Sequence, residues 1–293
     1  MKNLYTYILF LLAVFPAAAQ HNNSYVQYMF NGLLLNPAYA GSQEALNLTT
    51  LYRRQWLGIG GAPTTLSFGA HTPLKNKKVS VGLVVEQENI GLFDRTRAGL
   101  VYTYRIPFLK GQLAFGTQFG ARIEAYNWQR LKTQDSYDPN FTDLSNRIVN
   151  PDFGAGTYYH DKNMYAGFSA PSLFGAGFNK FQTLTFNTGG VIITSSELRI
   201  KPALLLKYIS GSPLSANLST TFYYKDILGI GLGYTMNTSL MSFADVRIND
   251  QLYFGYAYER ALNRLSTYTF GSHEVMLRYL FRYKINAINA RYF

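Results

Sequence analysis

The chain has 293 residues, of which 47% are hydrophobic and only 15% are charged, well below the roughly 25% charged residues of soluble domains. It contains no cysteine, which excludes disulfides, thiolate metal sites and cysteine nucleophiles. The net charge of +11 is spread along the chain and comes with no nucleic-acid motif. An anionic lipid surface or an acidic partner in a lumen therefore fits this charge better than DNA or RNA.

The N-terminus has the features of a secretory signal peptide. Lys2 is followed by an apolar run over residues 8–15, Pro16 interrupts this run, and three alanines occupy residues 17–19. A positive start, a short apolar core and small residues at a cleavage position are typical of such peptides. A membrane-spanning helix would need about 20 apolar residues. We therefore expect residues 1–19 to be removed before Gln20, with an uncleaved anchor helix as the alternative.

Residues 20–44 show no strand periodicity, and we predict that they form a periplasmic N-terminal segment. The apolar residues Tyr28, Met29 and Phe30 precede an Asn36-Pro37 pair, and such a pair favours a turn. Placed directly before the first strand, this segment could tuck into the periplasmic mouth of a barrel and help to seal it.

From residue 45 onward, apolar and polar residues alternate along many stretches. In residues 112–127, Phe115 and Phe119 share one face, while Gln118 and Arg122 share the other. A period of two indicates β-strands, although a soluble β-sandwich would show the same period. Strands longer than about 10 residues, charged groups on the polar faces and aromatic residues at the ends favour a membrane barrel whose apolar faces meet lipid.

We predict an all-β fold, a transmembrane antiparallel β-barrel of outer-membrane type with about 14 strands, an even number as single-chain bacterial barrels have. The barrel is expected within residues 45–283, followed by a C-terminal tail over residues 284–293. The predicted strands cover residues 45–56, 63–73, 78–88, 94–106, 112–127, 152–160, 163–170, 183–194, 197–209, 213–225, 228–236, 239–249, 251–260 and 272–283.

The lengths of the predicted connections support this strand order. If the N-terminus lies in the periplasm, every odd-numbered connection lies outside the cell. The long connections 128–151, 171–182 and 261–271 are all odd-numbered, while even-numbered connections such as 161–162 and 195–196 are tight. Bacterial barrels combine short periplasmic turns with longer outer loops, so the pattern predicts a multi-pass barrel in the cell outer membrane.

The sequence shows no recognisable site for catalysis, a cofactor or a metal ion. The histidines His21, His71, His160 and His273 lack metal-ligand spacing and belong to no visible catalytic constellation. The glycine-rich stretch at residues 58–61 opens no helix, so a hairpin loop explains it better than a phosphate cradle. We therefore expect that the protein is not an enzyme and binds no cofactor.

Several charged residues lie on the polar faces of predicted strands and should line the lumen. They could select a solute, or they could form an internal salt-bridge network that closes the barrel. We favour the network, because side chains and loops easily fill a lumen of this size. The set comprises Arg122, Glu124, Arg199, Lys201, Lys207, Asp245 and Arg247.

A longer motif stands shortly after the predicted signal peptide. Residues 27–42 read QYMFNGLLLNPAYAGS, a mixture of Asn, Pro and Tyr without simple periodicity. This stretch resembles the opening segment of the PorP/SprF family, outer-membrane proteins of the Bacteroidota type IX secretion system. Further similarity lies in the family's first hairpin, its last strand and its closing residues, at positions 52–56, 61–65, 71–74, 271–277 and 290–293.

The resemblance implies an accessory role in secretion. It implies a barrel that docks, anchors or assists secretion of a large cell-surface adhesin, which carries a C-terminal secretion domain, in gliding motility or surface attachment. It also implies contacts with periplasmic components of the secretion or gliding machinery, but no residue-level binding site. The alternatives are a channel for small hydrophobic or anionic solutes and, less well supported, an outer-membrane hydrolase. Outer-membrane lipid is the remaining expected partner.

Overall fold

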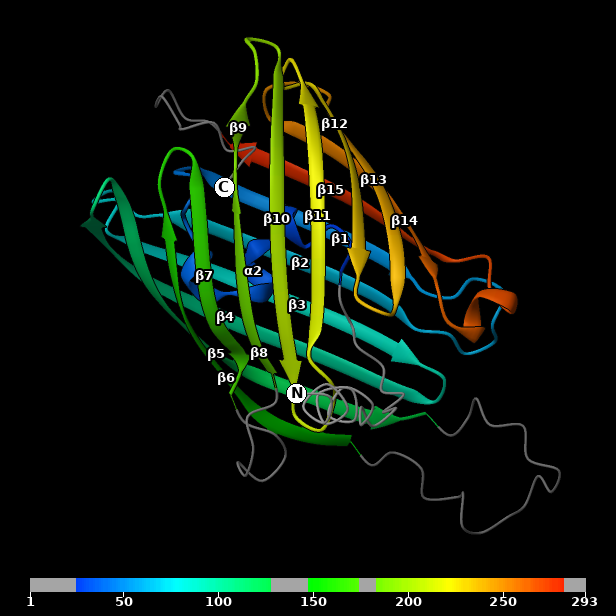
Figure 1. The fold of residues 1–293 in the computed structure, drawn as a ribbon. Coiled ribbons are helices and arrows are strands. Elements are labelled where there is room, and N and C mark those ends of the chain that lie inside the picture. Colours follow the sequence, from blue (N-terminus) through cyan, green and yellow to red (C-terminus); the bar gives the residue numbers. More distant parts are fainter. Residues whose placement is uncertain (1–24, 128–146, 174–182, 282–293) are drawn as a thin grey trace, which may run out of the picture.

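The structure, a computed structural model, describes residues 25–127, 147–173 and 183–281 and consists mainly of antiparallel strands. These strands run tilted around a central lumen, and the last strand pairs with the first (Figure 1). Within the described residues, no helix is long and apolar enough to cross a membrane. The strands are β1 (Leu46–Arg54), β2 (Thr64–Pro73), β3 (Val79–Ile90), β4 (Phe93–Phe108), β5 (Gly111–Tyr126), β6 (Arg147–His160), β7 (Met164–Ser172), β8 (Thr183–Gly190), β9 (Ile192–Ile193), β10 (Leu198–Ile209), β11 (Ser215–Tyr224), β12 (Leu228–Thr235), β13 (Ser239–Arg247), β14 (Leu252–Ala261) and β15 (Ser272–Phe281).

The strands occupy fourteen positions around a closed barrel, because β8 and β9 share one position. Both pair with β10, and Val191 interrupts the strand between them. Neighbouring strands pair antiparallel in sequence order, and the β1–β15 ladder closes the barrel. The predicted fold class and strand number are therefore confirmed, with the predicted strand 183–194 divided in two.

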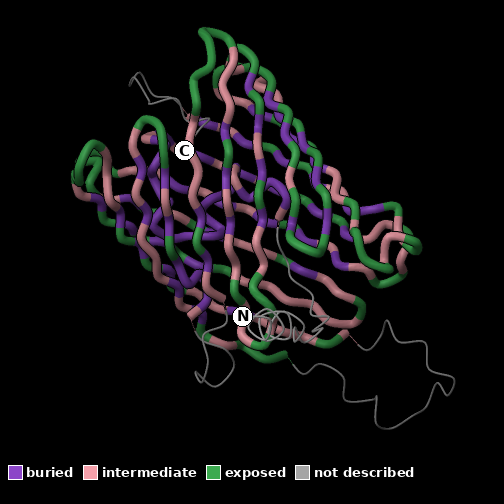
Figure 2. Tube along the Cα trace, viewed as in Figure 1, coloured by how far each residue is buried: buried purple, intermediate pink, exposed green. Residues whose placement is uncertain are grey.

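Buried and exposed residues alternate along the strands, as a two-residue period requires (Figure 2). On β5, Phe119 is 56% exposed on the outside of the barrel, whereas Gln118 is 1% exposed and faces the lumen. The faces predicted for residues 112–127 are thus confirmed. The outward faces carry most of the exposed large apolar side chains, including Tyr52, Leu100 and Leu277.

The two ends of the barrel differ in the length of their connections. At one end, the short-turn end, six connections of two to five residues cover residues 74–78, 109–110, 161–163, 194–197, 225–227 and 248–251. In four of these turns, one side-chain oxygen accepts hydrogen bonds from the backbone N–H groups two and three residues further along the chain. The residues that supply this oxygen are Asn76, Asp161, Ser195 and Asn249. These side chains mimic a backbone turn, which explains how so few residues reverse the chain.

The opposite end, the long-loop end, holds the connections 55–63, 91–92, 210–214, 236–238 and 262–271. The strand ends at Tyr126 and Arg147, and at Ser172 and Thr183, also lie at this end. The prediction that residues 147–151 belong to a loop is wrong: they pair with β5, from Ala125↔Arg147 onward, and lengthen β6. The rest of the predicted loop 128–151, residues 174–182 of the loop 171–182, the signal peptide 1–19 and the tail 284–293 lie outside the described residues.

Candidate functional site

Residues 25–45 fold into a compact segment inside the barrel, which we call the plug (Figure 1). It contains the 3-10 helix η1 (Tyr28–Phe30), the helical turn α2 (Gly32–Leu35) and the 3-10 helix η2 (Pro37–Tyr39). Asn36 is extended, and its side chain accepts the N–H of Ala38 (2.9 Å), which caps η2 next to a proline that begins it. A Cβ on Gly32 would lie 2.7 Å from the Tyr39 ring, so the chain can fold back only with glycine there.

The barrel wall satisfies the backbone carbonyls of the plug with side-chain donors. The hydroxyl of Ser169 donates to the Leu35 carbonyl (2.6 Å), and the hydroxyl of Thr103 donates to the Pro37 carbonyl (2.8 Å). The Arg105 guanidinium donates to the Ala40 carbonyl (3.0 Å). In return, the Gly41 N–H donates to Nδ1 of His71 (2.9 Å), and the Asn36 amide donates to the carbonyl of Thr157 (2.8 Å). Each bond satisfies a buried polar group that would otherwise lack water.

Glycines on the inward faces make room for the plug. A Cβ on Gly116 of β5 would lie 2.2 Å from the Ala38 nitrogen, and a Cβ on Gly156 of β6 would lie 2.2 Å from Oδ1 of Asn36. On β14, a Cβ on Gly255 would lie 2.2 Å from the Gln27 side chain. Plug atoms therefore approach the strand backbone closely at all three positions, and the requirement for glycine is strictest at Gly116, where the approaching atoms are backbone.

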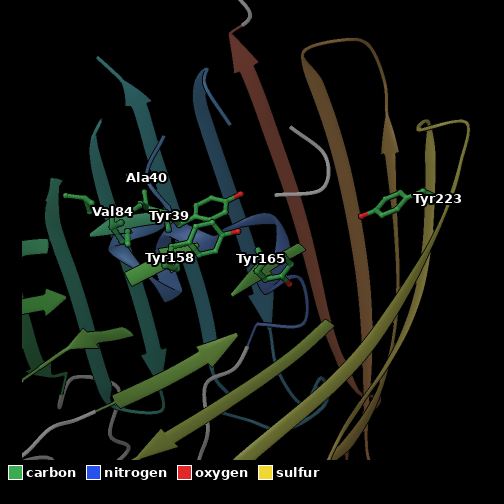
Figure 3. Packing of buried hydrophobic residues seen from close by; sticks show 11 residues of the cluster. Tyr39, Ala40, Val84, Tyr158, Tyr165 and Tyr223 are labelled. Carbon is green, nitrogen blue, oxygen red and sulfur yellow. The ribbon is translucent and has the colours of Figure 1, made fainter. Parts of the chain in front are cut away.

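Aromatic rings pack between the plug and the wall (Figure 3). Tyr39 of the plug lies edge-on to Tyr158 of β6, with ring centroids 5.4 Å apart. On another side, the buried guanidinium of Arg278 in β15 lies 5.6 Å from the Phe30 centroid and 4.5 Å from the Tyr253 centroid. Such cation–π contacts hold a buried charge between plug and wall.

The first residues of the plug are held by a charged group. The buried carboxylate of Glu274 accepts the N–H groups of Val26 (3.0 Å) and Gln27 (2.7 Å). The same carboxylate pairs with Arg53 (3.2 Å), and Arg53 also pairs with Glu259. These side chains come from the neighbouring strands β14, β15 and β1. Because every member has a partner, the lumen can hold this buried network.

A second network lies on the inward faces of β3 to β6. Its ion pairs have nitrogen–oxygen distances between 3.3 and 3.7 Å: Arg95–Glu88, Arg95–Glu124, Arg97–Asp152 and Arg122–Glu124. This arrangement includes Arg122 and Glu124, which the sequence placed in the lumen, and it fits the predicted salt-bridge network.

The other charged residues predicted for the lumen also lie on inward faces, but not in one group. Arg199 pairs with Asp226, and Arg247 lies 3.9 Å from Asp250 near the short-turn end. The Lys201 ammonium lies 5.4 Å from the Tyr165 ring centroid. Asp245 is buried and Lys207 is half-buried. The charged residues that the sequence predicted for the lumen did not include Arg53, Glu259 and Glu274. Their alternation places them on the lumen face, but no local pattern identifies the plug as their partner.

The plugged lumen leaves a small cavity between the plug and the wall. It measures about 10 Å³, about the space of one water molecule, and Tyr28, Gly32, Tyr39, Tyr165 and Lys201 are among its lining residues. Across the described ranges, no group of three or more His, Asp or Glu side chains could hold a metal ion. The chemistry that the site offers is the binding of peptide backbone by hydroxyl, amide and guanidinium donors.

A closed antiparallel barrel with an apolar outer belt and an occupied lumen defines an outer-membrane β-barrel protein. The fold is similar to that of the CymD monoaromatic hydrocarbon channel, at 10% identity over 87% of this chain and 94% of that chain, with a TM-score of 0.52. It is also similar to the outer membrane protein Omp33 of Acinetobacter baumannii, at 8% identity over 82% and 100% of the two chains, with a TM-score of 0.49. At 10% identity, the likeness to CymD shows the fold alone.

The sequence comparison identifies the family. Residues 17–279 match the family described as type IX secretion system membrane protein PorP/SprF, so the chain belongs to this family and is an outer-membrane barrel. A comparison with curated protein sequences gave no significant match. The match spans the plug and nearly the whole barrel, and it confirms the resemblance seen in residues 27–42.

Proposed function

We propose that this protein is a docking barrel, which anchors or assists secretion of a large cell-surface adhesin exported by the type IX secretion system. The observation that carries the proposal is the plug. Its carbonyls are bonded to the wall at Leu35, Pro37 and Ala40, and its first N–H groups are bonded to Glu274. A lumen that its own chain fills in this way is better suited to a rigid membrane anchor than to the passage of solutes.

A non-catalytic role is part of the proposal. Many of the buried charged side chains are used to hold the plug or to pair across the lumen, as Arg53, Glu274 and Arg105 do. Membership of the type IX secretion family supports a role beside cargo and machinery. The alternative remains a solute channel, and it requires the plug to leave the lumen.

The docking face that fits the proposal best is a joined pair of loops at the long-loop end. The loop 55–63 pairs with the loop 262–271 through Leu57 N–H to Gly271 O and Phe270 N–H to Leu57 O, both 2.8 Å. The second loop contains the 3-10 helix η6 (Arg264–Thr267). On this fixed platform Tyr268 and Phe270 are 75% and 76% exposed. Exposed aromatic side chains on a rigid base can act as anchors in an interface.

The test uses native membranes from a strain that expresses the full chain with an affinity tag. We expect a large adhesin with a C-terminal secretion domain to co-purify with the wild-type barrel and to lose its surface attachment when the gene is deleted. The variant Tyr268→Ser/Phe270→Ser should reduce co-purification. Leu214→Ser, an exposed apolar residue in another connection at the same end, is the matched control and should not.

A conductance measurement on the purified barrel in planar bilayers separates docking from transport. We expect no steady conductance while the plug is in place. Steady conductance, together with an adhesin that stays attached in the deletion strain, would contradict the docking proposal and favour the channel.

A further inference from the structure

A group of basic and aromatic side chains lies on the outer wall of the barrel, near the long-loop end. It consists of Arg54 on β1, Tyr256, Tyr258 and Arg260 on β14, and His273 on β15. These are neighbouring strands, in the order β14, β15, β1. We call these five residues the basic–aromatic cluster.

The cluster is held together by the strand register and by side-chain contacts. Arg54 and Tyr258 lie directly opposite His273 on either side, which places Cβ atoms about 5 Å apart. The Tyr256 hydroxyl is hydrogen bonded to Nδ1 of His273 (2.7 Å), and the Tyr258 and His273 rings lie 5.3 Å apart. Arg260 is the next outward residue after Tyr258 on the same strand.

Among the described residues, no ion pair neutralises the two arginines of the cluster. Within the described part of the chain, Arg54 and Arg260 are exposed and form no ion pair. The adjacent carboxylates Glu259 and Glu274 face the lumen, where both pair with Arg53. If the directly opposite residues are followed from Arg54 across the outer wall toward β4, the first carboxylate is Asp94. It lies three strands and about 14 Å away.

The position of the cluster matches the boundary of the apolar belt. One outward step from Arg54 and His273 toward the short-turn end, Tyr52 and Val275 lie level with Tyr256 of the cluster. One step further lie Phe254 and Leu277, and these four apolar and aromatic neighbours are all exposed on the outside of the barrel. Charged side chains on a lipid-facing strand surface cost little only near the interface, where tyrosines also gather. The arginines therefore lie at the level of lipid headgroups.

We propose that the basic–aromatic cluster is a binding site for the phosphate of an anionic membrane lipid in the leaflet at the long-loop end. Two guanidinium groups can each donate paired hydrogen bonds to phosphate oxygens. The tyrosine hydroxyls and the His273 ring supply further polar contacts. A lipid fits this site better than a soluble anion or a protein, because the cluster continues the apolar outer wall against which acyl chains pack. The site lies on the side wall next to the loops 55–63 and 262–271, and it shares no residue with the proposed docking face.

The test measures lipid binding to the full barrel by native mass spectrometry, with phosphatidylglycerol and phosphatidylcholine as probes. We expect phosphatidylglycerol to bind more tightly, and Arg54→Gln/Arg260→Gln to weaken its binding by about tenfold, as loss of charge-assisted hydrogen bonds predicts. The matched control Lys110→Gln/Lys162→Gln removes the same charge from turns at the short-turn end and should change binding less than about twofold.

Three results would overturn the proposal. The first is equal binding of phosphatidylglycerol to the wild type and to Arg54→Gln/Arg260→Gln, with both shown to be folded by heat-modified migration in gels. The second is binding of inorganic phosphate as tight as that of phosphatidylglycerol, which would indicate an anion site rather than a lipid site. The third is a change of oligomeric state in the variant without a change in lipid binding, which would assign the cluster to contacts between copies.

Discussion

The two faces of the same barrel wall follow different rules. On β5, the outward residues Phe115 and Phe119 share one property, an apolar surface that meets lipid. The inward positions of that strand are not alike: Gly116 leaves room for the backbone of Ala38, and Arg122 joins an ion-pair network. The outward face is therefore specified by the surrounding lipid. The inward face is specified by individual partners, which are other wall residues for Arg122 and, for Gly116, a segment about 80 residues earlier in the sequence.

The largest effect should come from filling the space that the plug occupies. In Gly116→Ala, the new Cβ would lie 2.2 to 2.4 Å from backbone atoms of Pro37 and Ala38, which cannot move aside as a flexible side chain can. We expect the plug to be displaced. Because the chain has no cysteine, the buried Ala40 can be changed to Cys as a reporter, which should react with a thiol reagent only when the plug has moved.

The matched control for this displacement is Gly99→Ala. Its Cβ would also meet inward atoms at 2.8 to 3.0 Å, but these belong to the side chain of Gln118 on the wall and not to the backbone of the plug. If Ala40→Cys is labelled as slowly in Gly116→Ala as in Gly99→Ala, the plug does not require glycine at residue 116.

The second effect concerns the charged end of the plug. Glu274→Ala leaves Arg53 with one partner fewer and releases the N–H groups of Val26 and Gln27. Removal of one partner from a buried ion pair costs about 3–5 kcal/mol, so the urea midpoint of unfolding should fall strongly. Glu197→Ala removes a half-exposed partner of Lys225 and should cost at most about 1 kcal/mol. Equal shifts would indicate that the Glu274 network is not buried in the membrane-inserted protein.

The third effect tests the outward face. Phe119→Arg places a charge in the lipid-facing belt and should lower the free energy of unfolding by roughly 2–4 kcal/mol near the bilayer midplane. Gln118→Ser, one residue away on the lumen face, should lower it much less. Both values can be measured by unfolding from lipid vesicles, and similar losses would mean that the two faces are assigned the wrong way round.

These two faces also explain what could be predicted from the sequence. The number of strands, their faces and the short turns depend on local patterns, such as the alternation in residues 112–127 and the turn side chains at Asn76 and Asp161. The plug site could not be derived in this way, because the partners of Glu274 and Thr103 lie more than 60 residues away in the sequence. Glycines at inward positions, such as Gly116 and Gly156, were the available clue that a second chain segment approaches the wall.

The smallest effect should come from a single neutral contact between wall and plug. In Thr103→Val the side chain keeps its shape, but the Pro37 carbonyl loses the hydroxyl that donates to it at 2.8 Å. A buried hydrogen bond of this kind contributes about 1 kcal/mol, so the loss should be measurable in the urea midpoint without displacement of the plug. Thr117→Val makes the same chemical change on the outward face of β5, where the side chain is exposed on the outside of the barrel, and should be neutral or stabilising because lipid favours the apolar residue. If Thr103→Val also leaves the urea midpoint unchanged, packing and the Glu274 network hold the plug. The hydroxyl donors of the wall then satisfy the backbone of the plug without adding to its stability.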